Sequence, residues 1–112
     1  MRQLRTGDLF SFARVIKASG IREDLVGYLQ KITTEADVTK VGMTTILMII
    51  EALSDKKAES AFYDAVAPVF EMSASDVESM PPSELFANLK QMAEENDLLN
   101  FFDSVFGTLG KN

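Results

Sequence analysis

Apolar side chains recur every three or four positions through most of this chain, and that spacing is the period of an α-helix. No convincing alternation of the kind that marks a β-strand follows the first few residues. The pattern therefore predicts an all-α fold, a single-domain bundle of five or six helices that occupies residues 1–112. The predicted helices lie approximately at residues 7–19, 22–32, 38–53, 56–67, 82–95 and 98–109.

Glycine, proline and short polar side chains mark the expected helix ends. Thr6 is the expected N-cap of the first helix, and Gly20 can adopt the left-handed conformation that closes a helix. A polar loop is expected at residues 33–37. Pro68 lacks the backbone N–H that a helix needs, so the fourth helix is expected to end or kink there. Residues 72–77 are expected to form a single serine-capped turn at most, and Pro82 suits the first turn of the next helix.

The apolar stripes identify candidate core residues. The third predicted helix is apolar nearly all round from Ile46 onward, which is typical of a helix buried at the centre of an all-α domain. The helix after Pro82 is expected to turn Leu85, Phe86, Leu89 and Met92 inward. In the first two helices the expected inward residues are Leu9, Phe12, Ala13, Ile16, Leu25, Tyr28, Leu29 and Ile32.

The last predicted helix has more large apolar side chains than one buried face can use. Positions 98, 102, 105 and 109 form one stripe, which alone could close the core, while Phe101 and Phe106 lie off that stripe on either side. Either two neighbouring helices cover both flanks, or one flank stays open and binds a partner protein. On the second interpretation the partner-binding residues are Leu99, Phe101, Phe106 and Leu109.

Charge is unevenly distributed along the chain. Residues 1–40 hold seven Lys and Arg against five Asp and Glu, whereas residues 41–112 hold four against twelve, and the net charge is −6. An acidic surface repels phosphate, so nucleic acid is not an expected partner of the chain as a whole. The asymmetry is either chance or a sign of head-to-tail self-association, in which a basic front meets an acidic back.

The residue types that carry most enzymatic chemistry are missing. The chain has no His, Cys or Trp, and it has no glycine-rich phosphate loop. The densest carboxylate cluster, Glu94, Glu95 and Asp97, falls at a junction of two helices, where a solvated helix end is the simpler interpretation. We therefore expect no enzymatic activity, no metal, no cofactor and no small-molecule substrate. The longest unbroken apolar run, residues 46–50, predicts no membrane span.

Residues 7–32 offer an alternative function. Two short helices around Ser19 and Gly20 resemble a helix-turn-helix, and they lie in the basic part of the chain, so a small DNA-associated regulator is conceivable. The helix that would enter the groove, however, begins Arg22-Glu23-Asp24, and two of these three residues are acidic. A plain helical hairpin within the bundle accounts for the segment better.

Five further segments follow one another in order over most of the chain, and none of them is a catalytic signature. They are Arg2-Gln3-Leu4-Arg5-Thr6-Gly7-Asp8-Leu9-Phe10, Ala13-Arg14-Val15-Ile16-Lys17, Gly20-Ile21-Arg22-Glu23-Asp24, Val77-Glu78-Ser79-Met80 and Asn96-Asp97-Leu98-Leu99-Asn100-Phe101-Phe102. Taken together, these segments resemble the small tail assembly chaperones of long-tailed phages and prophages of Gram-positive bacteria.

The resemblance implies an all-α, non-enzymatic protein of the bacterial cytoplasm. Such chaperones bind the long tape-measure protein, keep it soluble, help recruit tail-tube subunits, tend to self-associate and are absent from the mature virion. Many are made in two lengths by a programmed ribosomal frameshift. Lys111-Asn112 can be encoded by an A-rich slippery run, so we expect such a heptamer at that point of the gene. The family provides no residue-level binding motif, so the expected partner-binding residues come from the last helix alone.

Overall fold

A computed structural model describes residues 1–32 and 37–110. In this part of the chain all regular secondary structure is helical, and no strand is present. The all-α prediction is therefore confirmed for these residues, but the expected five or six helices are seven. They are α1 (Thr6–Ser19), α2 (Arg22–Gln30), α3 (Val38–Glu51), α4 (Lys56–Phe70), α5 (Ala74–Ser79), α6 (Pro82–Glu95) and α7 (Leu98–Gly110). Most of the predicted loop at residues 33–37 lies outside the described part.

The additional helix is α5, where a single turn at most was expected. Ser73 caps it: the Ser73 hydroxyl accepts a hydrogen bond from the backbone N–H of Asp76, whose carboxylate accepts one from the N–H of Ser73. This reciprocal capping box satisfies two donors that a helix start would otherwise leave free. Val77 then packs into the core and anchors the short helix against α4.

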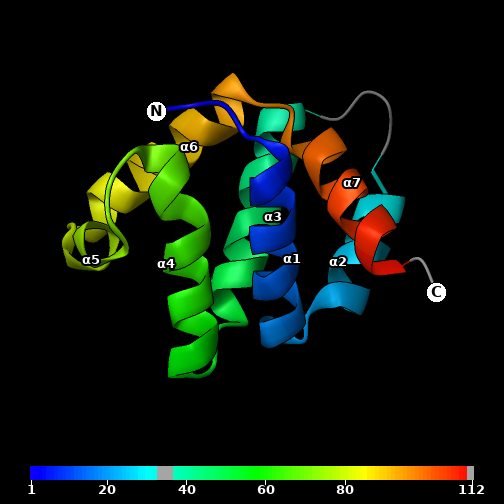
Figure 1. Cartoon of the computed structure of the whole chain (residues 1–112). Coiled ribbons are helices and arrows are strands. Elements are labelled where there is room, and N and C mark those ends of the chain that lie inside the picture. Colours follow the sequence, from blue (N-terminus) through cyan, green and yellow to red (C-terminus); the bar gives the residue numbers. More distant parts are fainter. Residues whose placement is uncertain (33–36, 111–112) are drawn as a thin grey trace.

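Helix α1 lies between α4 and α7, and it contacts both of them as well as α3 (Figure 1). Helix α3 packs against α6 and α7, α2 joins α1 and α7, and α5 contacts α4. The core fills the space that these contacts enclose. Its largest fully buried side chains are Phe12, Phe102, Ile16, Leu25, Ile46, Ile49, Leu89, Met92, Leu98, Val15, Val66 and Val69.

Two residues expected inside the core are exposed instead. Phe86 of α6 has 43% of its surface exposed, although Leu89 and Met92 of the same predicted stripe are fully buried. Helix α6 packs mainly against α3, so only the side of α6 that faces α3 is covered. On α3 itself Leu47 is 38% exposed, because it lies opposite the buried Thr45 and Ile49 on the helix. The prediction that α3 is buried all round is therefore wrong.

The helix ends follow the expected chemistry with two corrections. The N-cap of α1 is Arg5 rather than Thr6, and Gly20 closes that helix with a φ of 71°, as predicted. Helix α4 continues two residues past Pro68 and ends at Glu71, a left-handed cap with a φ of 61°. Pro68 falls in the last turn of α4, which closes with a hydrogen bond from the N–H of Met72 to the carbonyl of Ala67.

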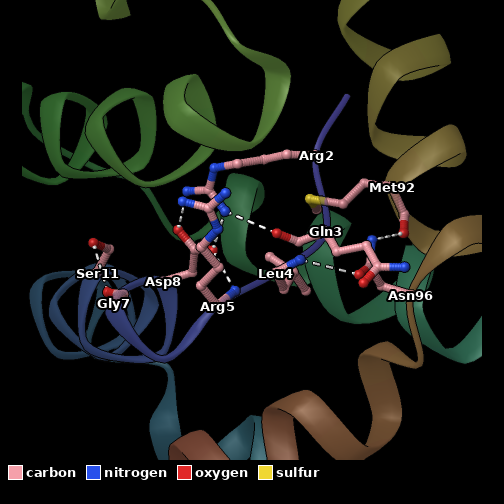
Figure 2. A network of polar contacts seen from close by, with 9 residues as sticks. All are labelled: Arg2, Gln3, Leu4, Arg5, Gly7, Asp8, Ser11, Met92 and Asn96. Carbon is pink, nitrogen blue, oxygen red and sulfur yellow. Dashed lines mark hydrogen bonds and ion pairs between the residues drawn. The ribbon is translucent and has the colours of Figure 1, made fainter.

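The segment before α1 forms a polar network that joins three helices (Figure 2). The Arg2 guanidinium donates two hydrogen bonds to the Asp8 carboxylate, at 2.8 and 2.9 Å, and the backbone N–H of Arg5 donates a third at 2.7 Å. The N–H of Arg2 bonds to the carbonyl of Val69 near the end of α4. The N–H of Leu4 bonds to the Asn96 side chain beyond the end of α6. These residues open the segment that carries the family resemblance.

Helices α3 and α7 approach closely at Gly42. A Cβ atom placed there would lie 2.9 Å from Cβ of Leu98, which is closer than two carbon atoms can pack. The absent side chain at Gly42 therefore allows Leu98 to sit fully buried at the start of α7. Glycine has a low helix propensity and weakens the start of α3, but the close packing of α3 against α7 requires it at position 42.

Candidate functional site

The four candidate residues on α7 differ in what covers them. Phe101 and Phe106 are half-buried and pack against the core, and Leu99 is partly buried. The side chain of Leu109 falls outside the described part of the chain. The stripe that was expected to close the core is confirmed at Leu98, Phe102 and Val105, which are at most 1% exposed. Helix α7 is thus a core helix, and the partly exposed Leu99, Phe101 and Phe106 flank its buried stripe.

Phe101 is held by an aromatic cluster. Its ring meets Phe12 of α1 edge-on, with the ring centroids 5.5 Å apart and the planes at 86°. The fully buried Phe102 lies edge-on to both rings, at 5.5 Å from Phe101 and 5.9 Å from Phe12. Edge-to-face pairs of this kind contribute about 0.5–1.5 kcal/mol beyond the area they bury. Phe101 therefore has a structural role on its inner side, and only its outer side can meet a partner.

Phe106 stacks on Phe102 and faces α2. The centroids of these two rings are 6.4 Å apart and their planes differ by 29°. On the other side Phe106 lines an open hollow of about 250 Å³ between α2 and α7, which it shares with Val26, Leu29, Gln30 and Asp103. Asp103 is exposed, and it is the only charged residue of α7. The lining of the hollow is mostly apolar, and the Asp103 carboxylate is its one charged group.

The most exposed apolar side chains of the described residues lie elsewhere. They are Phe10 on α1, Phe86 on α6, and Val38 and Leu47 on α3, with 49%, 43%, 39% and 38% of their surface exposed. None of these residues was predicted to bind a partner, and Phe86 was expected in the core. The exposure of Phe10 could have been predicted from helical periodicity. The buried side of α1 is formed by Phe12, Ala13, Val15 and Ile16, and Phe10 lies on the opposite side.

The densest carboxylate cluster lies in the open at the junction of α6 and α7. Glu94, Glu95 and Asp97 are all exposed, and the Asp97 carboxylate accepts hydrogen bonds from the backbone and side chain of Asn100 at the start of α7. A capped helix end explains this cluster. On α2, Glu23 and Asp24 are exposed in the first turn, where a groove-binding helix would meet phosphates. These two carboxylates would repel phosphate at the end of α2 that a helix-turn-helix places in the groove.

No family model matches this chain, and neither the curated proteins nor the solved structures contain a significant match. Within the described ranges, no helix is both long and apolar enough to cross a membrane. The candidate site is therefore defined by its own geometry. It is a set of apolar and aromatic side chains at the margin of α7, suited to burying apolar surface of another protein.

Proposed function

We propose that this protein is a non-enzymatic tail assembly chaperone of a long-tailed phage or prophage. In this role it binds the tape-measure protein in the bacterial cytoplasm, keeps it soluble, helps recruit tail-tube subunits and leaves before the virion is complete. The observation that carries the proposal is the half-exposed aromatic margin of α7 at Phe101 and Phe106. An apolar helix laid against either ring would bury surface on both proteins at a small cost in side-chain entropy.

The arrangement at α2 and α7 supports capture of a helix. The hollow lined by Val26, Leu29 and Phe106 lies between two helices, and such a groove accepts the apolar stripe of a third. Leu99 and Phe106 are seven positions apart, so they lie on one side of α7, about 10 Å from each other along its axis. That length matches two turns of a bound helix.

Substitution at the margin of α7 tests the proposal. Phe101→Asp with Phe106→Asp should abolish binding of the tape-measure protein, because both changes place charge in an apolar contact. Leu99→Gln with Phe106→Gln is the gentler variant, since it leaves the Phe101–Phe12 pair intact. We expect it to weaken capture at least tenfold in a co-expression pull-down, while helical content by circular dichroism stays near that of the wild-type protein.

Phe10→Gln with Val38→Gln is the matched control, because it removes two apolar side chains that are more exposed than Leu99, Phe101 and Phe106. It should capture the tape-measure protein as the wild type does. Equal capture by the Leu99/Phe106 variant would contradict the proposal. Global unfolding of the gentler variant would show that the margin of α7 belongs to the core.

Gene context provides an independent check of the same proposal. A gene for a major tail protein should lie just upstream, and a very long helical reading frame just downstream. The codons at Lys111-Asn112 should contain a slippery heptamer if a longer form is made. Codons without such a run would contradict the two-length form, and a different gene neighbourhood would contradict the chaperone role.

A further inference from the structure

The groove between α2 and α7 contains a single carboxylate. Helices α2 and α7 lie side by side (Figure 1), and the hollow between them is lined by Val26, Leu29, Gln30, Asp103 and Phe106. Asp103 is exposed, and the other four residues carry no charge. Within residues 1–32 and 37–110, Asp103 takes part in no ion pair. The groove is therefore mostly apolar, with one negative charge that no described cation neutralises.

Asp103 lies on the same side of α7 as two of the candidate partner-binding residues. Leu99, Asp103 and Phe106 are spaced by four and three positions, so they follow one stripe along the helix. Along the helix axis Asp103 is about 6 Å beyond Leu99 and about 4.5 Å before Phe106. A partner that contacts both apolar residues of this stripe must therefore also cover the carboxylate between them.

Covering Asp103 with a purely apolar surface is unfavourable. The carboxylate loses its hydration when a partner covers it, and this loss is costly unless a hydrogen-bond donor or an opposite charge replaces the water. A Lys ammonium or an Arg guanidinium on the partner supplies both, and a guanidinium can donate two hydrogen bonds to one carboxylate. An acidic side chain at the same place is repelled. The groove thus favours a helix that has a basic residue beside its apolar stripe.

A second copy of this chain does not suit the same stripe. Asp103 lies near the middle of the stripe from Leu99 to Phe106, so a two-fold contact centred there would bring two Asp103 carboxylates together. Like charges in one contact oppose association. The charge on α7 therefore indicates a partner with a different sequence.

We infer that Asp103 selects which segment of the tape-measure protein this groove binds, namely an amphipathic helix with Lys or Arg beside its apolar stripe. Apolar residues of that helix contact Leu99 and Phe106, and its basic residue binds the carboxylate between them. The apolar contacts supply most of the affinity, while Asp103 determines which helices are accepted and in which register. The inference rests on the proposed function, because it names the same partner and the same groove.

Charge reversal at Asp103 tests the inference in co-expression pull-downs with the full-length tape-measure protein. Asp103→Lys should weaken capture about tenfold, because an attraction becomes a repulsion. Asp103→Asn should weaken it less, and Asp103→Glu, which keeps the charge, should capture nearly as the wild type does. Capture by the wild type should fall as NaCl is added, whereas capture by Asp103→Asn should depend less on salt.

Glu94→Lys is the matched control for Asp103→Lys. It makes the same change of charge at an exposed position of α6, which does not line the groove. It should capture the tape-measure protein as the wild type does. Circular dichroism checks that every variant is folded.

A charge swap between the two proteins gives the decisive result. Overlapping peptides from the tape-measure protein, tested by fluorescence anisotropy on the purified full chain, locate the bound segment. Replacing the Lys or Arg beside the apolar stripe of that peptide with Glu should weaken binding to the wild type and restore binding to Asp103→Lys. The same replacement on the opposite side of the peptide should do neither. A merely structural role of Asp103 would give no such restoration.

Failure of this inference can be told apart from failure of the proposed function. If Asp103→Lys captures the tape-measure protein as the wild type does, while Leu99→Gln with Phe106→Gln does not, the inference alone is wrong. If the wild type captures no part of the tape-measure protein, both are wrong. A wild-type dimer in sedimentation velocity that Leu99→Gln with Phe106→Gln dissociates would make a second copy the occupant and would also overturn the inference.

Discussion

The buried carboxylate of Asp8 binds the segment before α1 to the start of α1. Its side chain is buried, with 4% of its surface exposed, yet three hydrogen bonds from Arg2 and Arg5 satisfy its carboxylate. Burial alone would raise the pKa of Asp8, but the hydrogen bonds and the nearby Arg2 charge outweigh it, so the pKa lies below the usual 3.8. The same pair raises the pKa of the Arg2 guanidinium.

Asp8→Asn should lower the free energy of unfolding at neutral pH by about 2 kcal/mol, because the amide cannot accept all three bonds and leaves Arg2 without a counter-ion. The folded-state pKa is depressed, so the unfolded chain binds more protons around the transition. The stability that Asp8 contributes is therefore present above pH 3.8 and is lost as the pH falls further toward the folded-state pKa. Urea unfolding at several pH values measures this difference.

The difference between the wild type and Asp8→Asn should consequently shrink below pH 3.8. Asp64→Asn removes the same charge at an exposed position of α4 and is the matched control. It should change the free energy of unfolding by less than about 0.5 kcal/mol at any of these pH values. A constant penalty for Asp8→Asn across the whole range would contradict the assignment.

At the scale of the helices, one contact decides how close α3 and α7 can come. Gly42→Ala would place a methyl group 2.9 Å from Cβ of Leu98, an atom fixed by the backbone of α7, so one of the two helices must shift. We expect a loss of about 1–3 kcal/mol, even though alanine is the better helix former. Thermal and urea unfolding measure it.

Gly27→Ala is the matched control for that substitution. Gly27 lies inside α2, and a Cβ atom there would have no atom within 4 Å. The variant should gain about 0.5–1 kcal/mol, because only helix propensity changes. A gain at Gly42 as well would show that α3 and α7 can separate at little cost.

Helical periodicity located most elements from the sequence, because each long helix buries one stripe. It also placed Leu98, Phe102 and Val105 in the core, as the structure confirms. Periodicity does not predict burial where it depends on how many other helices pack against the apolar side of a helix. A stripe indicates which side of a helix is apolar, but it does not reveal that α6 packs mainly against α3 and leaves Phe86 exposed. Nor does it find α5, which depends on a side-chain capping box rather than on a long apolar stripe.

The candidate site was harder to predict for the same reason. Phe101 and Phe106 were singled out by their excess over one stripe, and the structure places both half-buried beside the core. The inner contact of Phe101 with Phe12 depends on how α1 and α7 cross, which no local pattern encodes. Phe10 went unnoticed, since an isolated exposed aromatic residue is unremarkable in sequence.

Over the whole molecule, Asn96 joins the beginning of the described chain to its last two helices. Its side chain accepts a hydrogen bond from the N–H of Leu4 at 3.1 Å and donates one to the carbonyl of Met92 at 3.0 Å. Asn96→Ala should cost about 1–2 kcal/mol in the free energy of unfolding, because both backbone groups lose their partner.

Asn100→Ala provides the comparison for Asn96→Ala, since Asn100 is exposed and its side chain hydrogen-bonds to Asp97 at the surface. We expect a change within about 0.5 kcal/mol. Hydrogen exchange at Leu4 adds a local measurement: its amide should exchange faster in Asn96→Ala and at the wild-type rate in Asn100→Ala. An unchanged rate in Asn96→Ala would mean that the bond is not formed in solution.

The position of α1 between α4 and α7 has a consequence for synthesis on the ribosome. Helices α4 and α7, which make the most extensive contacts with α1, begin 37 or more residues after α1 ends. Phe12, Val15 and Ile16 therefore lack much of their native cover until α4 and α7 are made, and the hydrogen bond from Leu4 must wait for Asn96. Native burial of the inner side of α1 consequently waits until α4 and α7 have been synthesised.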